Sequence, residues 1–489
     1  MNGPLIRTPF QLLLLVAAFG FCARTTAGEL PAQPAAGEYK ITISTEHPVY
    51  LLGENVIVSF VLENTGAKEF TASFGADYRG GTRANRFKVT ASDSSGRVAD
   101  DPAEEQRNFG GFVTSAKLAP GQTHRETLSL TAYCRITQPG TYRVRVSHDC
   151  GWQVTAGQLP SAETTVTFRL PSEAEAEAVV AKMAANNAQP RSFGDGRTAS
   201  DFSSLQAPIY LPPLLRRAQT GDRQALIGLG SIATPEATAA LIQLASESQG
   251  VFATEVGGVL MRRLPDLVLP DHPPKESAQA HLAAMAWDEK LRPAALVLAR
   301  NWLARDDPEF IAAGAGILRL LGSAEDAPAL LATLDRVIKP MTTPRDESAD
   351  VGNYPKPVQQ LLGAFFGLRT RGYAPDEATL TTDGAVMAYF DSFRAKRAPR
   401  PQKWQELFAA YNANPCVVLR EAAIRSVPYP APVEYAALLA SAKSDPDAGV
   451  RGAVLFVTEH KIIIRPPPGF SKNFPPTIIN VPSDTGQGK

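Results

Sequence analysis

Residues 225–245 read ALIGLGSIATPEATAALIQLA, and the spacing of apolar residues in this stretch predicts two short helices. In the first helix, alanine and leucine fall on one face up to Gly230, and over 237–244 they again recur every three or four residues. The Thr-Pro-Glu sequence at 234–236 is typical of a turn followed by a helix start. We expect Gly230 to end the first helix in a left-handed conformation, which glycine adopts without strain.

Related fragments recur further along the chain. Residues 307–331 repeat the pattern, and Gly230 and its counterpart Gly322 lie 92 residues apart. Near the carboxyl end, Arg420 and Arg451 each follow a turn and lead an alanine-rich helix, and they are 31 residues apart, so 92 is close to three such steps. Both spacings lie in the range of helical repeat arrays.

These fragments resemble HEAT repeats, in particular the short HEAT-like repeats found in phycobilisome lyases. The resemblance spans residues 212–460 and is clearest at 222–246, 307–335 and 413–460. It implies an α-helical solenoid, whose stacked repeats leave an extended surface for binding another protein.

Two regions depart from the repeat pattern, at 262–292 and 336–405. Both contain proline-bearing insertions, one of which is the KPMTTPR sequence at 339–345. In a solenoid such insertions project as loops from one face, which is often the binding face.

Residues 39–170 are expected to form a β-sandwich. Apolar side chains alternate from Val56 to Leu62, as in a half-buried strand. Other short strands are expected at 41–43, 87–89, 127–130, 142–146 and 164–168. About seven short strands separated by turns are typical of a sandwich.

Residues 118–146 resemble the second half of bacterial immunoglobulin-like domains. The resemblance extends over roughly residues 40–170 and is carried by the Leu-Ala-Pro-Gly sequence at 118–121 and by the Gly-x-Tyr-x-Val-x-Val run that contains Tyr142. It implies a tyrosine corner, in which the Tyr142 hydroxyl satisfies a backbone group where the chain crosses between sheets.

The amino terminus has the pattern of a secretory signal peptide. Residues 1–27 contain an early cation, Arg7, then an apolar core and a small-residue cleavage site, so the mature chain is expected to begin at Gly28. Losing Arg7 and Arg24 changes the formal net charge from 0 to −2. Because Phe21 stands where a lipoprotein signal needs a small residue, Cys22 is not expected to be a lipid anchor.

The remaining organisation follows from composition. Residues 171–211 are expected to be a linker that starts as an acidic helix at Glu173, and residues 461–489 form a proline-rich tail in which helix is excluded. This tail is either disordered or an extended arm that caps the last repeat or docks on a neighbour. We expect a bacterial exported protein, periplasmic or extracellular, with no transmembrane segment in its mature chain.

Local signatures of catalysis are missing from the sequence. It has no phosphate-binding loop, no His-Glu-x-x-His pair and no Gly-x-Ser-x-Gly elbow. The histidines lack ligand spacing; they are His47, His124, His148, His272, His281 and His460. We therefore expect no catalytic residue, no cofactor and no metal ion. The balance of 49 basic and 49 acidic residues also makes nucleic acid an unsuitable partner.

Three local clusters have a structural and a chemical interpretation. His148-Asp149-Cys150 suggests a nucleophile with its base, but neighbouring residues at a strand end point to opposite sides, which favours a turn. The acids Glu104 and Glu105 are expected to be a solvated pair on a loop. Asp445 is expected to cap a helix with Pro446 in its first turn, and not to bind calcium.

The cysteines leave one alternative open. Export permits a disulfide between Cys134 and Cys150, although the strand from Tyr142 separates them by roughly 15 Å at about 3.3 Å per residue. Cys416 is expected to be a small buried apolar side chain.

The leading hypothesis is an exported, non-catalytic interaction or scaffold protein that binds another protein through its helical surface. One alternative is a hydrolase that uses acids from the insertions, marked by two carboxylates within about 10 Å. The other is a glycan- or peptide-binding module that uses a strand edge of the sandwich or exposed aromatic residues: Tyr78, Phe109, Phe112 and Trp152.

Overall fold

The computed structural model describes the chain in segments. They are residues 31–75, 83–102, 113–154, 159–187, 202–265, 284–346, 354–373, 380–394, 410, 413–427, 431–459, 461–464 and 477–480. The expected signal peptide lies outside the described residues, as do Tyr78, Glu104, Glu105, Phe109, Phe112, His272, His281 and His460.

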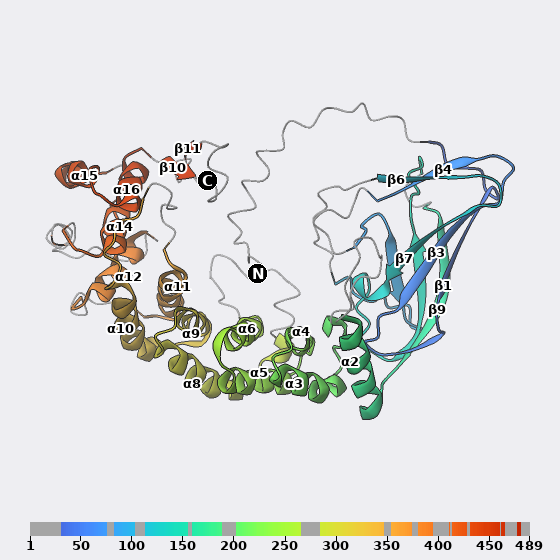
Figure 1. Cartoon of the computed structure of the whole chain (residues 1–489), viewed down its shortest axis with the longest axis horizontal. Helices are drawn as coiled ribbons and strands as arrows, with labels where there is room; N and C mark the ends of the chain where they lie inside the picture. Colours follow the sequence, from blue (N-terminus) through green and yellow to red (C-terminus); the bar gives the residue numbers. More distant parts are fainter. Residues whose placement is uncertain are drawn as a thin grey trace. The chain divides into compact units, whose positions relative to one another are not determined.

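The chain combines β-strands and α-helices in two compact units (Figure 1). The first unit comprises Met1–Pro171 with Asn187–Ser200, and the second comprises Ser172–Asn186 with Asp201–Lys489. Most of the segment that the sequence suggests is a linker therefore belongs to the helical unit. The physical reason is burial, since Phe202, Leu205 and Tyr210 are fully enclosed.

The first unit is built from two larger sheets and a two-stranded ribbon. One sheet has the order β1-β3-β7, the other β2-β9-β8-β5, and β4 pairs with β6. All of these pairs are antiparallel except β2 with β9. The strands are β1 (Tyr39–Thr45), β2 (Val49–Leu51), β3 (Ile57–Asn64), β4 (Phe70–Gly75), β5 (Lys88–Ser92), β6 (Val113–Leu118), β7 (Thr123–Ser129), β8 (Gly140–Ser147) and β9 (Ser161–Arg169).

The alternation predicted for β3 is confirmed. Val58, Phe60 and Leu62 are fully buried, while the residues between them are partly exposed. Phe60 meets Phe87, which precedes β5 of the other sheet, edge to face at 5.3 Å between ring centroids. The two sheets therefore share one apolar core, which supplies the main stabilising free energy of this unit.

The tyrosine corner is also present. The Tyr142 hydroxyl of β8 donates a hydrogen bond to the carbonyl oxygen of Gln138 at 3.0 Å. Gln138 lies in the connection that leads from β7 of one sheet to β8 of the other. The buried ring thus fixes the crossover through its only polar atom.

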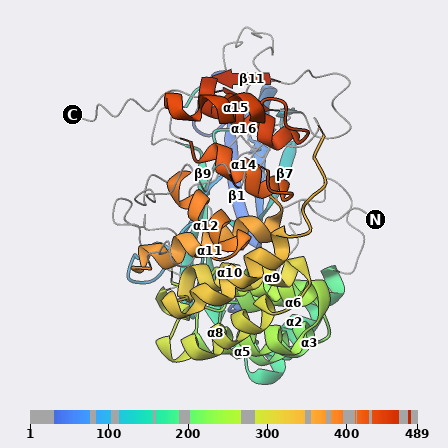
Figure 2. The same ribbon diagram turned by 90° about the vertical axis from the view of Figure 1, so that its left-hand side faces the viewer.

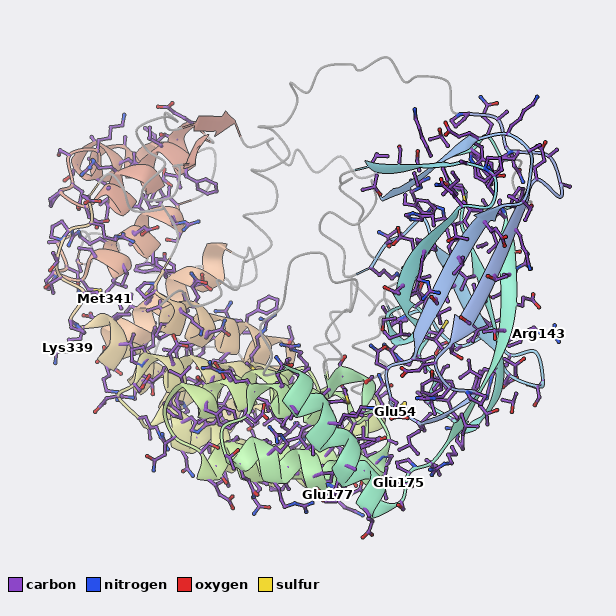
Figure 3. The ribbon with its side chains drawn as sticks, turned by 45° about the vertical axis from the view of Figure 1, so that its right-hand side comes forward. Glu54, Arg143, Glu175, Glu177, Lys339 and Met341 are labelled. Carbon is purple, nitrogen blue, oxygen red and sulfur yellow. The ribbon has the colours of Figure 1, made fainter. Side chains whose placement is uncertain are left out.

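The second unit contains paired helices. In the described part of the chain they are α2 (Glu173–Asn187), α3 (Leu211–Gln219), α4 (Arg223–Ser231), α5 (Pro235–Glu247), α6 (Gly250–Met261), α8 (Arg292–Leu303), α9 (Pro308–Leu321), α10 (Ala327–Ile338), α11 (Lys356–Thr370), α12 (Asp383–Arg394), α14 (Val417–Arg425), α15 (Ala436–Ala442) and α16 (Ala448–Glu459). The expected acidic helix at Glu173 is confirmed, and Ser172 and Glu175 cap it reciprocally. Figure 3 labels Glu175 and Glu177 on this helix.

These helices form two layers. Helices α3, α5, α8 and α10 follow one another in one layer, and α4, α6, α9 and α11 follow one another in the other (Figure 1). Toward the carboxyl end, α12, α14 and α16 pack in succession (Figure 2). Helix α5, for example, buries Ala237, Leu241 and Leu244, the apolar face that its 3.6-residue periodicity predicts.

The prediction that residues 225–245 form one repeat unit is wrong. Helix α4 packs mainly on α3 and α6, whereas α5 packs on α6 and α8, so the stretch 225–245 joins two successive pairs and is not one packed pair. Likewise, Gly230 in α4 and Gly322 after α9 are separated by two steps of the described layer, α4 to α6 and α6 to α9. The longer segment between α6 and α8 explains why 92 residues hold two steps.

Helix starts follow the predicted chemistry with one correction. Thr234 accepts a hydrogen bond from the Ala237 amide and caps α5, whose first residue is Pro235. At the carboxyl end, however, Asp447 caps α16 by accepting from the Val450 amide, two residues after the expected Asp445.

Two arginines satisfy the carbonyl ends of the α4/α9 layer. The fully buried Arg263 donates to the carbonyl of Gly230 at the end of α4 and to those of Ile232 and Thr234, which follow α4. Arg371 does the same for residues 318–322 at the end of α9. Burial lowers the pKa of Arg263 to about 10, and the carbonyl dipoles of the helix end compensate its charge.

Gly230 has a role different from the one predicted. It lies inside α4 and is not among the residues with positive φ, so it needs no left-handed backbone. A Cβ atom there would lie 2.7 Å from Cγ1 of Val259 on α6. Gly230 thus allows two helices of one layer to approach closely, and a larger residue would displace the Val259 side chain.

The tail contains short strands. β10 (Lys461–Ile464) pairs antiparallel with β11 (Thr477–Asn480), and β10 lies against α16. The described parts of the tail therefore agree with the extended-arm alternative.

The corner predicts a measurable stability effect. Tyr142→Phe removes the hydroxyl and leaves the Gln138 carbonyl without its donor, so it should cost on the order of 1 kcal/mol. Urea denaturation of the chain, followed by a probe of β-structure, measures this change. An unaltered midpoint would show that the corner hydrogen bond contributes nothing.

Two glycines give a matched test of helix packing. A Cβ at Gly258 on α6 meets no atom within 4 Å, so Gly258→Ala should stabilise its helix by about 0.5–1 kcal/mol. Gly230→Ala should stabilise less than Gly258→Ala, because its Cβ atom clashes with Val259. In a Val259→Ala background this clash is absent, so Gly230→Ala should there give the larger gain. Thermal unfolding of the four variants measures the coupling, and strict additivity would contradict the close approach.

Candidate functional site

The His148-Asp149-Cys150 sequence forms the turn after β8. Nδ1 of His148 accepts a hydrogen bond from the Cys150 amide at 2.8 Å, and Cys150 adopts a positive φ of 55°. Asp149 instead forms an ion pair with Arg86, which also donates to the carbonyls of Ser73 and Gly75. His148 and Asp149 thus have different main partners, and the Cys150 Sγ atom contacts the His148 carbonyl oxygen at 3.8 Å, as expected of a turn.

The three thiols in the described part of the chain are buried and free. Cys134 and Cys150 are not bonded to each other, which settles the alternative that the sequence leaves open. Burial raises the pKa of both thiols to about 12, so each stays protonated at neutral pH. Cys416 is buried as expected, and burial also raises its pKa. Protonated, enclosed thiols are poor nucleophiles.

The turn attaches the β4–β6 ribbon to the rest of the unit. The Cys150 carbonyl accepts from the Ser73 amide at 2.8 Å, and the Trp152 indole donates to the Thr71 carbonyl at 2.8 Å. Trp152 is buried, so it is not the exposed aromatic that the glycan-binding alternative requires. The other three aromatics of that alternative lie outside the described residues.

A second cluster joins parts of the helical unit that are distant in sequence. Arg345, which follows α10, reaches Asp447 at the start of α16 and Glu421 in α14. Its Nη2 atom donates to Glu421 Oε2 at 2.6 Å and to Asp447 Oδ1 at 2.7 Å, and its Nε atom donates to Asp447 Oδ2 at 2.9 Å. We call Arg345, Glu421, Asp447 and Gly449 the guanidinium site.

Both carboxylates of the guanidinium site are fully buried. Burial alone would raise the pKa of Asp447, but hydrogen bonds from the Arg345 side chain and amide and from the Val450 amide outweigh it and lower the pKa. Burial opposes the charge of Arg345 as well, and the two carboxylates reverse this and raise its pKa. The cluster is therefore a mutually dependent set of charges.

Gly449 makes room for the guanidinium. A Cβ atom at this position would lie 2.0 Å from Nη2 of Arg345. Arg425 adds a second cation, 3.4 Å from Glu421 Oε1. The sequence gives no local signal for this site, because Glu421 and Asp447 lie 76 and 102 residues after Arg345, and Arg345 itself lies in a segment expected to project as a loop.

The segment that carries Arg345 also caps both helices through its backbone. The carbonyl oxygen of Met341 accepts from the Val417 amide at the start of α14, and that of Arg345 accepts from the Ala448 amide at the start of α16. We call residues 339–346 the strap; Lys339 and Met341 are labelled in Figure 3. The expectation that 339–345 projects as a loop is wrong, because it lies across these helix ends.

A second arginine, next to Glu421 in the sequence, also pairs with a carboxylate near the start of α16. Arg420 of α14 forms a two-pronged pair with Asp445, with Nε to Oδ2 at 2.9 Å and Nη2 to Oδ1 at 3.0 Å. It also donates to the Asn414 carbonyl in the turn before its own helix. Asp445 thus ties one turn to the next.

In the described ranges no group of three or more histidine, cysteine, aspartate or glutamate side chains is arranged to hold a metal ion. None of the described helices has both the length and the apolar character needed to cross a lipid bilayer. Glu421 and Asp447 lie close together, but Arg345 occupies the space between them.

The buried His148 predicts a pH dependence. Burial, with Arg86 and His124 nearby, lowers its pKa to about 4, and Asp149 only partly opposes this. Since the unfolded value is about 6.5, its contribution to stability is complete above pH 6.5 and is lost as the pH falls through 4. Between pH 7 and pH 5 this should remove on the order of 2 kcal/mol.

The measurement compares urea unfolding of the first unit at pH 7 and pH 5 in three proteins. His148→Asn keeps an acceptor for the Cys150 amide but does not titrate, so it should be less pH-sensitive than the wild type. His47→Asn, at an exposed position, should behave as the wild type. Equal pH dependence in all three would contradict the assignment.

Arg345 predicts a large stability effect. Arg345→Ala leaves two buried carboxylates without their main cation, and should cost about 3 kcal/mol or more. Arg223→Ala is the matched control, because Arg223 is 67 % exposed and its pair with Glu255 is at the surface; it should change stability by about 0.5 kcal/mol or less. Denaturant unfolding of the helical unit measures both, and similar effects would contradict the burial argument.

Comparisons with known proteins identify no family. No protein-family model matches the chain, and no curated protein matches it. Solved structures that it resembles include a β-glucosidase from Erythrobacter marinus (TM-score 0.17, 27% of this chain and 15% of that one) and the sporulation control protein Spo0M from Bacillus subtilis (TM-score 0.18, 31% and 56%), both at 15% identity. A β-glucosidase from Listeria innocua gives a TM-score of 0.15 at 15% identity, over 27% of this chain and 16% of that one. The chain thus spans about half or less of the length of these proteins, and at such scores the likeness carries no argument about fold or activity.

Proposed function

We propose that the protein is an exported, non-catalytic interaction or scaffold protein. In this proposal the first unit is an immunoglobulin-like sandwich and the second is a HEAT-like solenoid that binds another protein through its helical surface. The two-layer succession of helices supports the solenoid assignment, and the two sheets linked by the Tyr142 corner support the sandwich.

The observation that carries the proposal is the exposed surface of α4 and α6. These neighbouring helices of one layer present Ile227, 41 % exposed, and Val251, 62 % exposed. An ion pair between Arg223 and Glu255 joins the same two helices at the surface. Exposed apolar side chains beside a surface ion pair are suited to a protein partner.

The chemistry of the polar clusters also favours binding over catalysis. The thiols at Cys134 and Cys150 are held protonated by burial. The close carboxylates Glu421 and Asp447 are enclosed and neutralised by Arg345, so they are unsuited to serve as the acid pair of a hydrolase.

The experiment uses the mature chain from Gly28 as bait in the exported fraction of its own cells. A partner retained by the wild type should be retained about tenfold less by the double variant Ile227→Glu/Val251→Glu, since burying an unpaired charge costs about 1.4 kcal/mol or more. Val297→Glu is the matched control, because Val297 is 55 % exposed on α8 of the other layer. Equal retention by both variants would contradict the assignment of this surface.

Export is tested separately. Mass spectrometry of the protein recovered outside the cytoplasm should give an amino terminus at Gly28. Intact chain found only in the cytoplasm would overturn the proposed localisation.

A further inference from the structure

The strap contacts two successive helices as a bound peptide would. Its two capping carbonyls, at Met341 and Arg345, are four residues apart, and the amides that they accept from, at Val417 and Ala448, open α14 and α16. Four residues of chain reach at most about 13 Å, enough to cross the 8–10 Å between packed helices. The spacing of the two carbonyls along the strap therefore matches the spacing between the two helices.

The side chain of Arg345 supplies the specific part of this contact. It enters between Glu421 and Asp447, and Gly449 leaves the space that the guanidinium fills. Two buried carboxylates accept three hydrogen bonds from its planar fork. A lysine ammonium has no such fork and would satisfy fewer of these oxygens.

Most side chains of the strap face solvent. Lys339, Pro340 and residues 342–344 are exposed, and the strap meets the starts of α14 and α16 through its two carbonyl caps and through Arg345. A segment bound through backbone groups and one anchoring side chain can be replaced by another segment that offers the same groups.

We propose that the ends of α14 and α16 form a binding site for a peptide segment that carries arginine, and that the chain fills this site with its own strap. A partner with the same chemistry competes with residues 339–346 for the guanidinium site. This inference deepens the proposed function and rests on it only in treating the helical unit as a protein-binding surface. The site is separate from the exposed residues of α4 and α6.

The probe is a fluorescent peptide with the strap sequence, KPMTTPRD, and binding is followed by anisotropy with the full-length mature chain. In the wild type the tethered strap competes at high effective concentration, so Arg345→Ala should bind the peptide at least about tenfold more tightly. The same peptide should raise the midpoint of thermal unfolding of Arg345→Ala, because it returns a guanidinium to Glu421 and Asp447.

Two controls define specificity. A peptide with alanine in place of arginine should neither bind nor stabilise Arg345→Ala, and a lysine peptide should bind at least about fivefold more weakly than the arginine peptide. Arg223→Ala should bind the peptide as weakly as the wild type does.

The result that would overturn the inference is equal binding of the arginine and alanine peptides, or no stabilisation of a folded Arg345→Ala chain. Arg345 would then be a structural pair alone. If Arg345→Ala does not fold, the same comparison is made with Arg345→Lys, which keeps a cation in the site. Loss of strap binding leaves the α4/α6 test intact, so failure here and failure of the proposed function are distinguishable.

Discussion

The carboxyl-terminal part of the helical unit depends on one guanidinium placed between two fully buried carboxylates. Without Arg345, Glu421 and Asp447 would be charged groups in a water-poor interior, a condition that costs several kcal/mol. Their burial therefore makes the stability of this region depend on a guanidinium between them. Because the strap follows α10, it connects the middle of the array to its end, 102 residues later.

Arginine serves a related purpose elsewhere in the same unit. Arg263 and Arg371 each reach from beyond one helix to the carbonyl end of the neighbouring helix in its layer. A single long side chain thereby satisfies several acceptors that would otherwise be buried without donors. Guanidinium groups thus fix helices of this unit in two ways. Arg263 and Arg371 bind carbonyl groups at the ends of α4 and α9, and Arg345 binds carboxylates of α14 and at the start of α16.

In the first unit the polar contacts serve connections between strands. Tyr142 fixes the crossover between the two sheets, and the turn at 148–151 holds β4. His148 accepts the Cys150 amide hydrogen bond only while its Nδ1 atom is unprotonated. Burial favours this neutral form and lowers the pKa of His148, whereas acid protonates the ring. The His-Asp-Cys sequence resembles a catalytic set, but its contacts are those of a turn: His148 accepts from the Cys150 amide, and Asp149 pairs with Arg86.

Local patterns predicted the elements better than their assembly. Alternation identified β3 and β8, and helical spacing identified α4, α5 and α9, because these depend on each residue's immediate neighbours. The short or polar strands β2, β4 and β6 gave no such signal. They form because β9 and the turn at 148–151 offer partners.

The tertiary contacts had no local signature. Gly230 was interpreted as a helix end, because a glycine before a turn usually is one, whereas its role is set by Val259 on another helix. Arg345 lay in a proline-bearing insertion whose sequence suggests a loop. Nothing near it in the chain indicates that Glu421 and Asp447 are its partners.

Hydrogen exchange at the starts of α14 and α16 tests the central claim most directly. The amides of Val417 and Ala448 are protected only as long as the Met341 and Arg345 carbonyls lie on them. In Arg345→Ala we expect both amides to exchange faster than in the wild type, with α4 and α6 unchanged. Unchanged protection at Val417 and Ala448 would contradict the account, because the strap would then stay in place without its arginine.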